Sequence, residues 1–322
     1  MGGIQVTSSK SRIALFAATI AVFAPGAAGA AYVSQPVPRS EAIGSGPYRA
    51  VMESDPGLAT HTLYRPADLG AVKGKLPIIV WGNGACANEG NRFRWFLSEI
   101  ASHGYLVVAI GPIDKPEMEI WKESAPQPAP GGLPRDLPPP RTHTSQLIDA
   151  MNWAIAENGR AGSRFQGRLD PSKVAVMGMS CGGAQTIEAS ADPRVVTSVV
   201  WNSGLFPDPT AMGGGKTLTK DDLKLIHAPV AYISGDASDV AYVNANDDFE
   251  RINHVPIFRA YRHKTGHGGT YGELNGGAFG KVGVAWLDWR LKGDAQAGKM
   301  FLGASCGLCT NAEWVVKQKN LR

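Results

Sequence analysis

Short apolar runs alternate with helix-like stretches along most of the chain. The runs are five to seven residues long and occupy 76–81, 105–110, 173–177, 195–201, 230–234 and 256–260. Such runs are typical of strands that are buried on both faces of a mainly parallel sheet. Between and after them, apolar residues recur at helical spacing, as at 92–102 and at Val282, Ala285, Trp286 and Trp289. The alternation predicts an α/β fold with a mostly parallel central sheet and helices on both faces.

Two segments depart from this alternation. Residues 48–64 predict two strands around the turn Asp55-Pro56-Gly57. Residues 112–141 carry nine prolines, which a regular helix or a central strand does not tolerate. We interpret this stretch as a long loop that leaves a single domain, 31–322, and returns to it.

The N-terminal 30 residues have the pattern of a secretory signal peptide. Lys10 and Arg12 precede an apolar run at 13–23, and Ala28-Gly29-Ala30 offers a small-residue cleavage site. A membrane anchor is the alternative, but a spanning helix needs about 20 apolar residues. The pattern therefore predicts cleavage after residue 30 and a secreted or periplasmic protein without stable membrane insertion.

The charge balance excludes some classes of partner. The chain has 32 Lys and Arg against 28 Asp and Glu, and the leader contains two of the basic residues and no acidic ones. No long basic run is present. We therefore expect neither nucleic acid nor an anionic membrane as a partner. No pattern in the sequence selects an oligomeric state.

A candidate nucleophile lies between a predicted strand and a predicted helix. Gly178-Met179-Ser180-Cys181-Gly182 matches G-x-S-x-G, directly after 173–177 and before the helix-like 184–189. A nucleophile on such a sharp turn needs small neighbours, which the two glycines provide. The helix N-terminus beneath it favours developing negative charge. The setting favours Ser180 as nucleophile over an incidental serine in a glycine-rich turn.

The chain order of such sites is serine, then acid, then histidine. Four histidines follow Ser180, namely His227, His254, His263 and His267. The first two precede predicted strands, whereas catalytic groups gather at the carboxyl ends of parallel strands. His267 is favoured over His263 as the base because glycines flank it and let its loop approach the serine.

The acid is expected on the loop after the strand at 230–234. Asp239 and Asp236 both qualify, and Asp239 is favoured because the apolar 240–242 follow it and can bury its carboxylate. A calcium site that groups these two with Asp247 and Asp248 is the competing interpretation. The four do not match the spacing of a calcium-binding loop, so no metal site is predicted.

Two backbone N–H groups are candidates for an oxyanion hole, the site that binds the negative oxygen of a tetrahedral intermediate. One belongs to Cys181, the residue after the nucleophile. The other belongs to Asn83 in Trp81-Gly82-Asn83-Gly84, which follows the strand 76–81. A plain glycine turn is the alternative for this second segment.

The four cysteines suggest a disulfide framework. Cys306 and Cys309 form a C-x-x-C without the further ligands that a zinc site needs, so a structural disulfide is expected there. Cys86 lies on the oxyanion loop and Cys181 beside the nucleophile, and these two segments must lie close together. A Cys86–Cys181 disulfide and two buried free thiols both remain open.

An apolar substrate cleft is expected near the strand ends. Its candidate residues are Trp81, Trp121, Trp201, Asn202 and Phe206. Core packing is the alternative for the aromatic ones, because large aromatic side chains are mostly buried.

Several of these stretches together resemble a known family. Gly46-Pro47-Tyr48, Ala101-Ser102-His103-Gly104-Tyr105, 176–180 and Gly283-Val284-Ala285-Trp286 are similar to segments of secreted α/β-hydrolases of the bacterial cutinase-like polyester hydrolase and dienelactone-hydrolase-like group. The resemblance runs from about residue 46 to the C-terminus. It implies an α/β-hydrolase fold, Ser180, Asp239 and His267 as the triad, Asn83 and Cys181 as oxyanion donors, and no cofactor. The polyester hydrolases tend to have an aromatic residue at position 83 and often methionine at 181.

The residues and the resemblance together predict a serine-dependent carboxylic ester hydrolase. It would act through an acyl-enzyme on a small-molecule or polymeric ester outside the cytoplasm. A serine peptidase or amidase is one alternative, because the same triad serves amides. A non-catalytic binding protein on a hydrolase scaffold is another.

Overall fold

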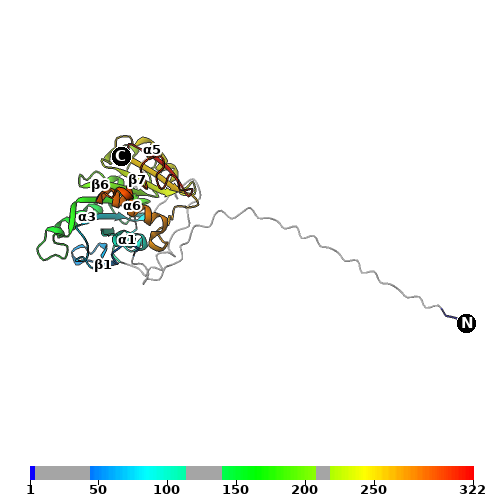
Figure 1. Ribbon diagram of the computed structural model, residues 1–322, viewed down its shortest axis with the longest axis horizontal. Helices are drawn as coiled ribbons and strands as arrows, with labels where there is room; N and C mark the ends of the chain where they lie inside the picture. Colours follow the sequence, from blue (N-terminus) through cyan, green and yellow to red (C-terminus); the bar gives the residue numbers. More distant parts are fainter. Residues whose placement is uncertain (4–43, 114–139, 208–217) are drawn as a thin grey trace. The chain divides into compact units, whose positions relative to one another are not determined.

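The computed structural model describes residues 1–3, 44–113, 140–207 and 218–322 (Figure 1). The predicted signal peptide after its first three residues, its cleavage site, Trp121 and most of the proline-rich stretch lie outside these residues. The described part of 31–322 forms one compact unit.

A nine-stranded sheet runs through this unit. Its order is β1-β2-β4-β3-β5-β6-β7-β8-β9. The strands are β1 (Ala50–Ser54), β2 (His61–Pro66), β3 (Leu76–Gly82), β4 (Leu106–Ile110), β5 (Leu169–Met179), β6 (Val195–Trp201), β7 (Val230–Gly235), β8 (Ile257–Arg262) and β9 (Trp314–Lys319). The six strands from β4 to β8 in this order are parallel, whereas β1, β2 and β9 pair antiparallel at the two edges.

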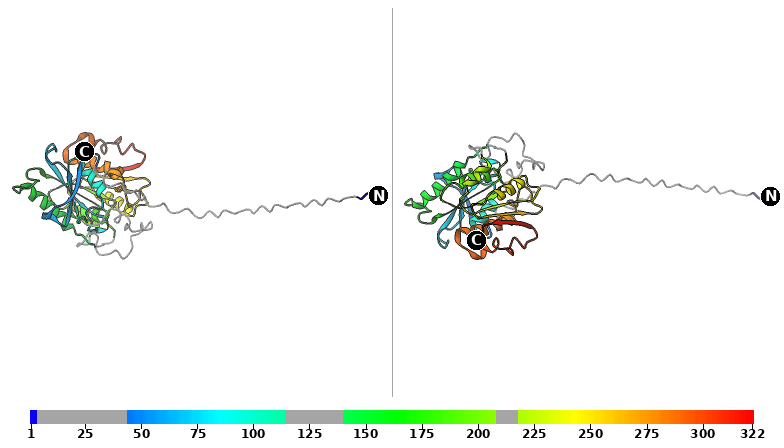
Figure 2. Two further views of the ribbon diagram at one scale, coloured as in Figure 1. Left: turned by 90° about the horizontal axis from the view of Figure 1, so that it is seen from below. Right: turned by 90° about the horizontal axis from the view of Figure 1, so that it is seen from above.

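Helices cover both faces of the sheet (Figures 1 and 2). The α-helices are α1 (Arg94–Ser102), α3 (Thr144–Gly159), α4 (Cys181–Ala189), α5 (Tyr242–Arg251), α6 (Gly277–Lys292) and the short α7 (Ala295–Gly298). The 3₁₀ turns are η2 (Pro56–Leu58), η3 (Gly84–Cys86), η4 (Lys220–Leu225) and η5 (Leu274–Gly276). Helices α1 and α6 pack on one face, and α3, α4 and α5 pack on the other. Among the helices described, none combines the length and apolarity needed to cross a bilayer.

The apolar runs are explained by burial on both faces. On β3, Ile79 and Trp81 point to the side of α1 and α6, while Ile78 and Val80 point to the side of α3. Side chains of a strand alternate between faces, so a strand with two covered faces must be apolar at every position. The α/β-hydrolase architecture predicted from the sequence is confirmed by the sheet order and these two layers.

The sequence pattern did not predict strand β9. The run at 256–260 is the last strand that the pattern predicts, but β9 follows it and pairs antiparallel with β8. Strand β9 is an edge strand with only one buried residue, Trp314, and with lysines at 317 and 319. A half-exposed edge strand of this kind produces no apolar run.

Candidate active site

Ser180 lies in the sharp turn between β5 and α4. Its φ of 54° and ψ of −117° are a conformation that a non-glycine residue rarely adopts. Glycines two residues before and two residues after it permit the turn. A Cβ on Gly178 would collide with the backbone of Gly182, and a Cβ on Gly182 would collide with the carbonyl of Gly82. The turn therefore places a partly exposed Ser180 side chain at the N-terminus of α4.

Ser180, His267 and Asp239 form a hydrogen-bonded chain. The Oγ of Ser180 lies 2.9 Å from Nε2 of His267, and Nδ1 of His267 lies 2.7 Å from Oδ1 of Asp239. The three residues follow β5, β8 and β7, so the carboxyl ends of three parallel strands bring them together. The sequence predicted these three positions, and the structure places them within reach of one another.

The two competing candidates lie elsewhere. The exposed His263 packs its ring against Tyr261, with centroids 5.8 Å apart. Asp236 accepts hydrogen bonds from the hydroxyl of Ser238 at 2.8 Å and from the N–H of Lys264 at 2.7 Å. Asp236 therefore shapes the loop around the site, and the carboxylate that meets His267 is that of Asp239.

Asp239 is buried but remains ionised. Burial acts to raise the pKa of its carboxyl group, but hydrogen bonds from His267, from the N–H of Ala241 and from Asn202 outweigh burial and hold that pKa below its ordinary value. The N–H of Gly235 also donates to Oδ2, at 3.1 Å. A fixed negative charge thus faces Nδ1 of His267.

Asn202 does not lie at a substrate cleft. The sequence suggested a substrate contact, but its side chain is fully buried and donates to Oδ2 of Asp239 at 2.7 Å. The hydroxyl of Tyr271, also buried, donates to Oδ1 of Asn202. Sequence reasoning missed Tyr271 altogether, because no local pattern connects it to residues 32 and 69 positions away. The one available signal was an asparagine directly after a predicted strand, where the chain adopts a φ of 39°.

The loop after β3 is held against the nucleophile turn. The side-chain amide of Asn83 donates to the carbonyls of Ala87, Glu89 and Ile110 at 2.7–3.1 Å, which fixes the loop. The carbonyl of Asn83 accepts from the N–H of Gly182 at 3.0 Å. Since the first N–H groups of a helix have no intrahelical partner, the N–H of Cys181 at the start of α4 needs another acceptor.

A disulfide between Cys86 and Cys181 connects this loop to α4. Their Cα atoms are 5.2 Å apart, and the pairing settles the choice between a disulfide and two free thiols. Ala85 and Cys86 both have positive φ, 55° and 47°, which is unfavourable for residues other than glycine. The expected Cys306–Cys309 disulfide is present too, between α7 and β9.

Two of the predicted cleft residues belong to the core, which corrects the sequence interpretation. Trp81 and Trp201 have no exposed surface. Both pack against Phe96, with ring centroids 5.3 and 5.1 Å away. They lie near the carboxyl ends of β3 and β6, on the face of the sheet that α1 and α6 cover. Phe206, which is half-buried, keeps the exposure that a substrate contact needs.

Two of the four aspartates that the calcium interpretation groups are paired with a lysine. Asp247 and Asp248 bind Lys220 at 2.8 and 2.5 Å. Within the described residues, no group of three or more His, Cys, Asp or Glu side chains is placed to hold a metal ion.

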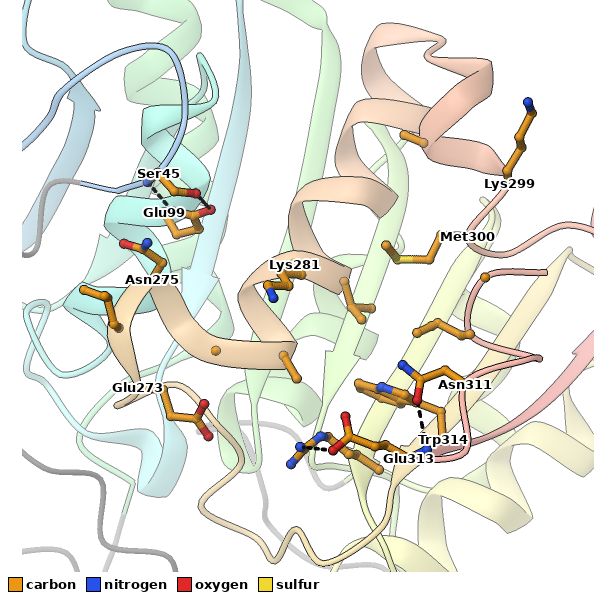
Figure 3. Close-up of a pocket in the computed structure, with 18 of the residues that line it drawn as sticks. Ser45, Glu99, Glu273, Asn275, Lys281, Lys299, Met300, Asn311, Glu313 and Trp314 are labelled. Carbon is orange, nitrogen blue, oxygen red and sulfur yellow. Dashed lines mark hydrogen bonds and ion pairs between the residues drawn. The ribbon is translucent and has the colours of Figure 1, made fainter.

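A separate cavity of about 870 Å³ lies between η5, α6 and the segment that leads into β9 (Figure 3). In Figure 3, Lys281 on α6 lies between the hydrogen-bonded pair Ser45–Glu99 and the pair Glu313 and Trp314. None of the residues of the Ser–His–Asp chain lines this cavity.

The chain has distant similarity to a protein of known class. The chain is 27% identical over 204 residues to a cutinase from Thermobifida fusca, which covers 61% of this chain. The match spans 58% of the length of that curated relative. No family model matches the chain.

Proposed function

We propose that this protein is a serine-dependent hydrolase of carboxylic esters, with Ser180, His267 and Asp239 as its triad. The observation that carries the proposal is the hydrogen-bonded chain from Oγ of Ser180 through His267 to the buried Asp239 carboxylate. The similarity to a cutinase favours an ester as the substrate. The substrate class is a small-molecule or polymeric ester.

The proposed reaction proceeds in two halves. His267 accepts the proton of Ser180 while Oγ attacks the ester carbonyl, and the carbonyl π electrons move to oxygen. The tetrahedral intermediate then collapses, His267 gives the proton to the departing alcohol, and an acyl-enzyme remains. Water then attacks the acyl-enzyme while His267 takes its proton. The second tetrahedral intermediate collapses, His267 gives that proton to Oγ of Ser180 as the C–Oγ bond breaks, and the carboxylic acid is released.

Groups around Ser180 and His267 stabilise the charges that develop during the reaction. Asp239 orients the imidazole and stabilises its protonated form in each half-reaction. The N–H groups of Asn83 and Cys181 are the proposed donors to the oxyanion. One such donor is worth about 2.7–4 kcal/mol in a transition state.

Two other functions are less well supported. A peptidase or amidase would use the same residues, and the cutinase similarity argues for esters. A binding protein would have no use for a serine in a strained turn, which costs on the order of 1–3 kcal/mol. The strained Ser180 aligned with His267 therefore argues for catalysis.

We further propose that the protein acts outside the cytoplasm after removal of residues 1–30. The two disulfides support this location, because disulfides persist in oxidising compartments. The leader pattern described above adds the route of export.

The test is turnover of p-nitrophenyl esters, from acetate to long acyl chains, by wild type and Ser180→Ala. Ser172→Ala, which changes an exposed serine bonded to Asp170, is the matched control. We expect kcat to fall by a factor on the order of 10⁴ or more in Ser180→Ala and to stay unchanged in the control. Equal turnover by wild type and Ser180→Ala would overturn the proposal. Mass spectrometry of a fluorophosphonate adduct should locate the label on Ser180.

A further inference from the structure

The two residues that follow β6 connect the nucleophile turn to the acid. The hydroxyl of Ser203 donates to the carbonyl of Ser180 at 2.7 Å. The amide of Asn202 donates to Oδ2 of Asp239 at 2.7 Å. Movement of this segment would therefore be felt at both ends of the proposed triad.

The orientation of the Asn202 amide is fixed by a second buried group. Its Oδ1 accepts the hydroxyl proton of Tyr271, so its NH₂ must face Asp239. Burial, together with the negative charge of Asp239, raises the pKa of Tyr271 well above its ordinary value. The tyrosine hydroxyl therefore stays protonated and acts as a donor to Asn202.

The position of Asn202 on the carboxylate is distinctive. His267 and the N–H of Ala241 share Oδ1 of Asp239, while Asn202 and the N–H of Gly235 share Oδ2. Among the bonds described at this carboxylate, Asn202 gives the one side-chain hydrogen bond besides that of His267. It holds the oxygen that His267 does not use, and so sets the direction of the oxygen that His267 does use.

We propose that Asn202 is a positioning residue for the ester hydrolysis proposed above, on which this inference rests: its amide, oriented by Tyr271, holds the Asp239 carboxylate in the geometry that His267 requires. The charged and titratable groups that face this carboxylate are His267, Tyr271 and the buried Arg259 on β8, which interacts with Asp239 through its charge.

A backbone role is the competing explanation for Asn202. Its φ is 39°, and asparagine is several-fold enriched at positive φ. Asn202→Gly separates the two roles, because glycine adopts positive φ without strain and lacks the amide. Tyr271→Phe removes only the hydroxyl that orients the amide, and leaves residue 202 unchanged.

The measurement is kcat and KM for a p-nitrophenyl ester across pH, with active sites counted by fluorophosphonate titration. For Asn202→Gly we expect kcat to fall about 10- to 100-fold with KM little changed, as for the loss of a hydrogen bond to a charged group. We also expect the acid limb of the kcat/KM profile to move to higher pH. The Asp239 carboxylate is less stable as an anion once it has lost a hydrogen-bond donor, and this favours the protonated form of the Asp239–His267 pair.

Tyr271→Phe should act in the same direction with a smaller loss, about 3- to 10-fold in kcat. The matched control is Tyr105→Phe, which removes a buried tyrosine hydroxyl bonded to Asp288 at 2.6 Å, away from the site. It should lower thermal stability without moving the pH profile. In an Asp239→Ala background, Asn202→Gly should have no further effect on kcat.

The outcomes separate this inference from the proposed function. If Ser180→Ala is as active as wild type, the proposed function fails, whatever Asn202 does. If wild type depends on Ser180 but Asn202→Gly keeps both kcat and the acid limb, Asn202 serves the backbone alone and this inference is wrong. An equal effect of Asn202→Gly with and without Asp239 would also overturn it.

Discussion

The two disulfides should contribute very unequally to stability. The Cys86–Cys181 link joins residues 95 apart in sequence, whereas Cys306–Cys309 joins residues 3 apart. Loop-closure entropy in the unfolded chain assigns about 4.7 kcal/mol to the first and about 1.6 kcal/mol to the second. We therefore predict that the Cys86→Ala/Cys181→Ala variant loses roughly 3 kcal/mol more free energy of unfolding than the Cys306→Ala/Cys309→Ala variant.

Urea denaturation of both double variants and wild type measures this difference. Thermal unfolding should show Tm lowered by roughly 8 °C in the first variant and by about 3 °C in the second, because the entropy of unfolding is large for a chain of this length. Both variants replace paired sulfurs by alanine; Cys86, Cys181 and Cys306 are buried and Cys309 is half-buried, so the loss of packing differs at one of the four positions. Equal losses in the two variants would refute the reasoning from loop length.

Catalysis gives a second readout for the first variant. The link fastens the loop of Asn83 to the start of α4. With the variant still folded at 25 °C, we expect kcat to fall by up to about 10²- to 10³-fold, the value of one oxyanion donor, with KM less affected. An unchanged kcat would show that the bonds of Asn83 alone hold the loop.

Two further changes probe the turn and the buried acid. Gly182→Ala should abolish turnover and destabilise the fold, because its methyl group collides with the carbonyl of Gly82. Gly159→Ala, with open space around it, is the control. An active Gly182→Ala variant would contradict the geometry of the turn. Burial, which outweighs the charge of Lys220, raises the pKa of Asp248 to about 6. The stability it contributes is present below its unfolded pKa of about 3.9 and is lost as pH rises through about 6. Urea denaturation should show the advantage of wild type over Asp248→Asn falling by roughly 2–3 kcal/mol from pH 4 to 8, and a constant difference would show that this carboxyl ionises normally.

The sequence was informative wherever local constraints are strong. A strand with two covered faces must be apolar throughout, so β3, β4 and β6 are predicted to within a residue or two. The G-x-S-x-G turn admits only glycine at positions 178 and 182, two residues before and after Ser180, because a Cβ at either position would meet backbone. Chain order and the glycines around His267 narrowed the remaining candidates to those that the structure brings together.

The parts that were missed depend on contacts between distant segments. Trp81 and Trp201 were expected at a cleft, yet both side chains pack into the core between the sheet and helices α1 and α6. Asn202 lies 37 residues before Asp239, and no local pattern reveals that their side chains meet. The sequence left the pairing of Cys86 with Cys181 open, because the pairing depends on how the ends of the two neighbouring strands β3 and β5 are arranged rather than on spacing.

The outer strands of the sheet also affect how copies of this protein meet. An uncovered strand can pair with the strand of another molecule, and charged side chains oppose such pairing. At one edge, Lys317 and Lys319 of β9 interact with Glu250 and the carbonyl of that residue. At the other, Glu53 of β1 binds Arg65 and Arg164. A further strand added at either edge would have to disrupt these contacts, so the charges oppose growth of the sheet by pairing between edges.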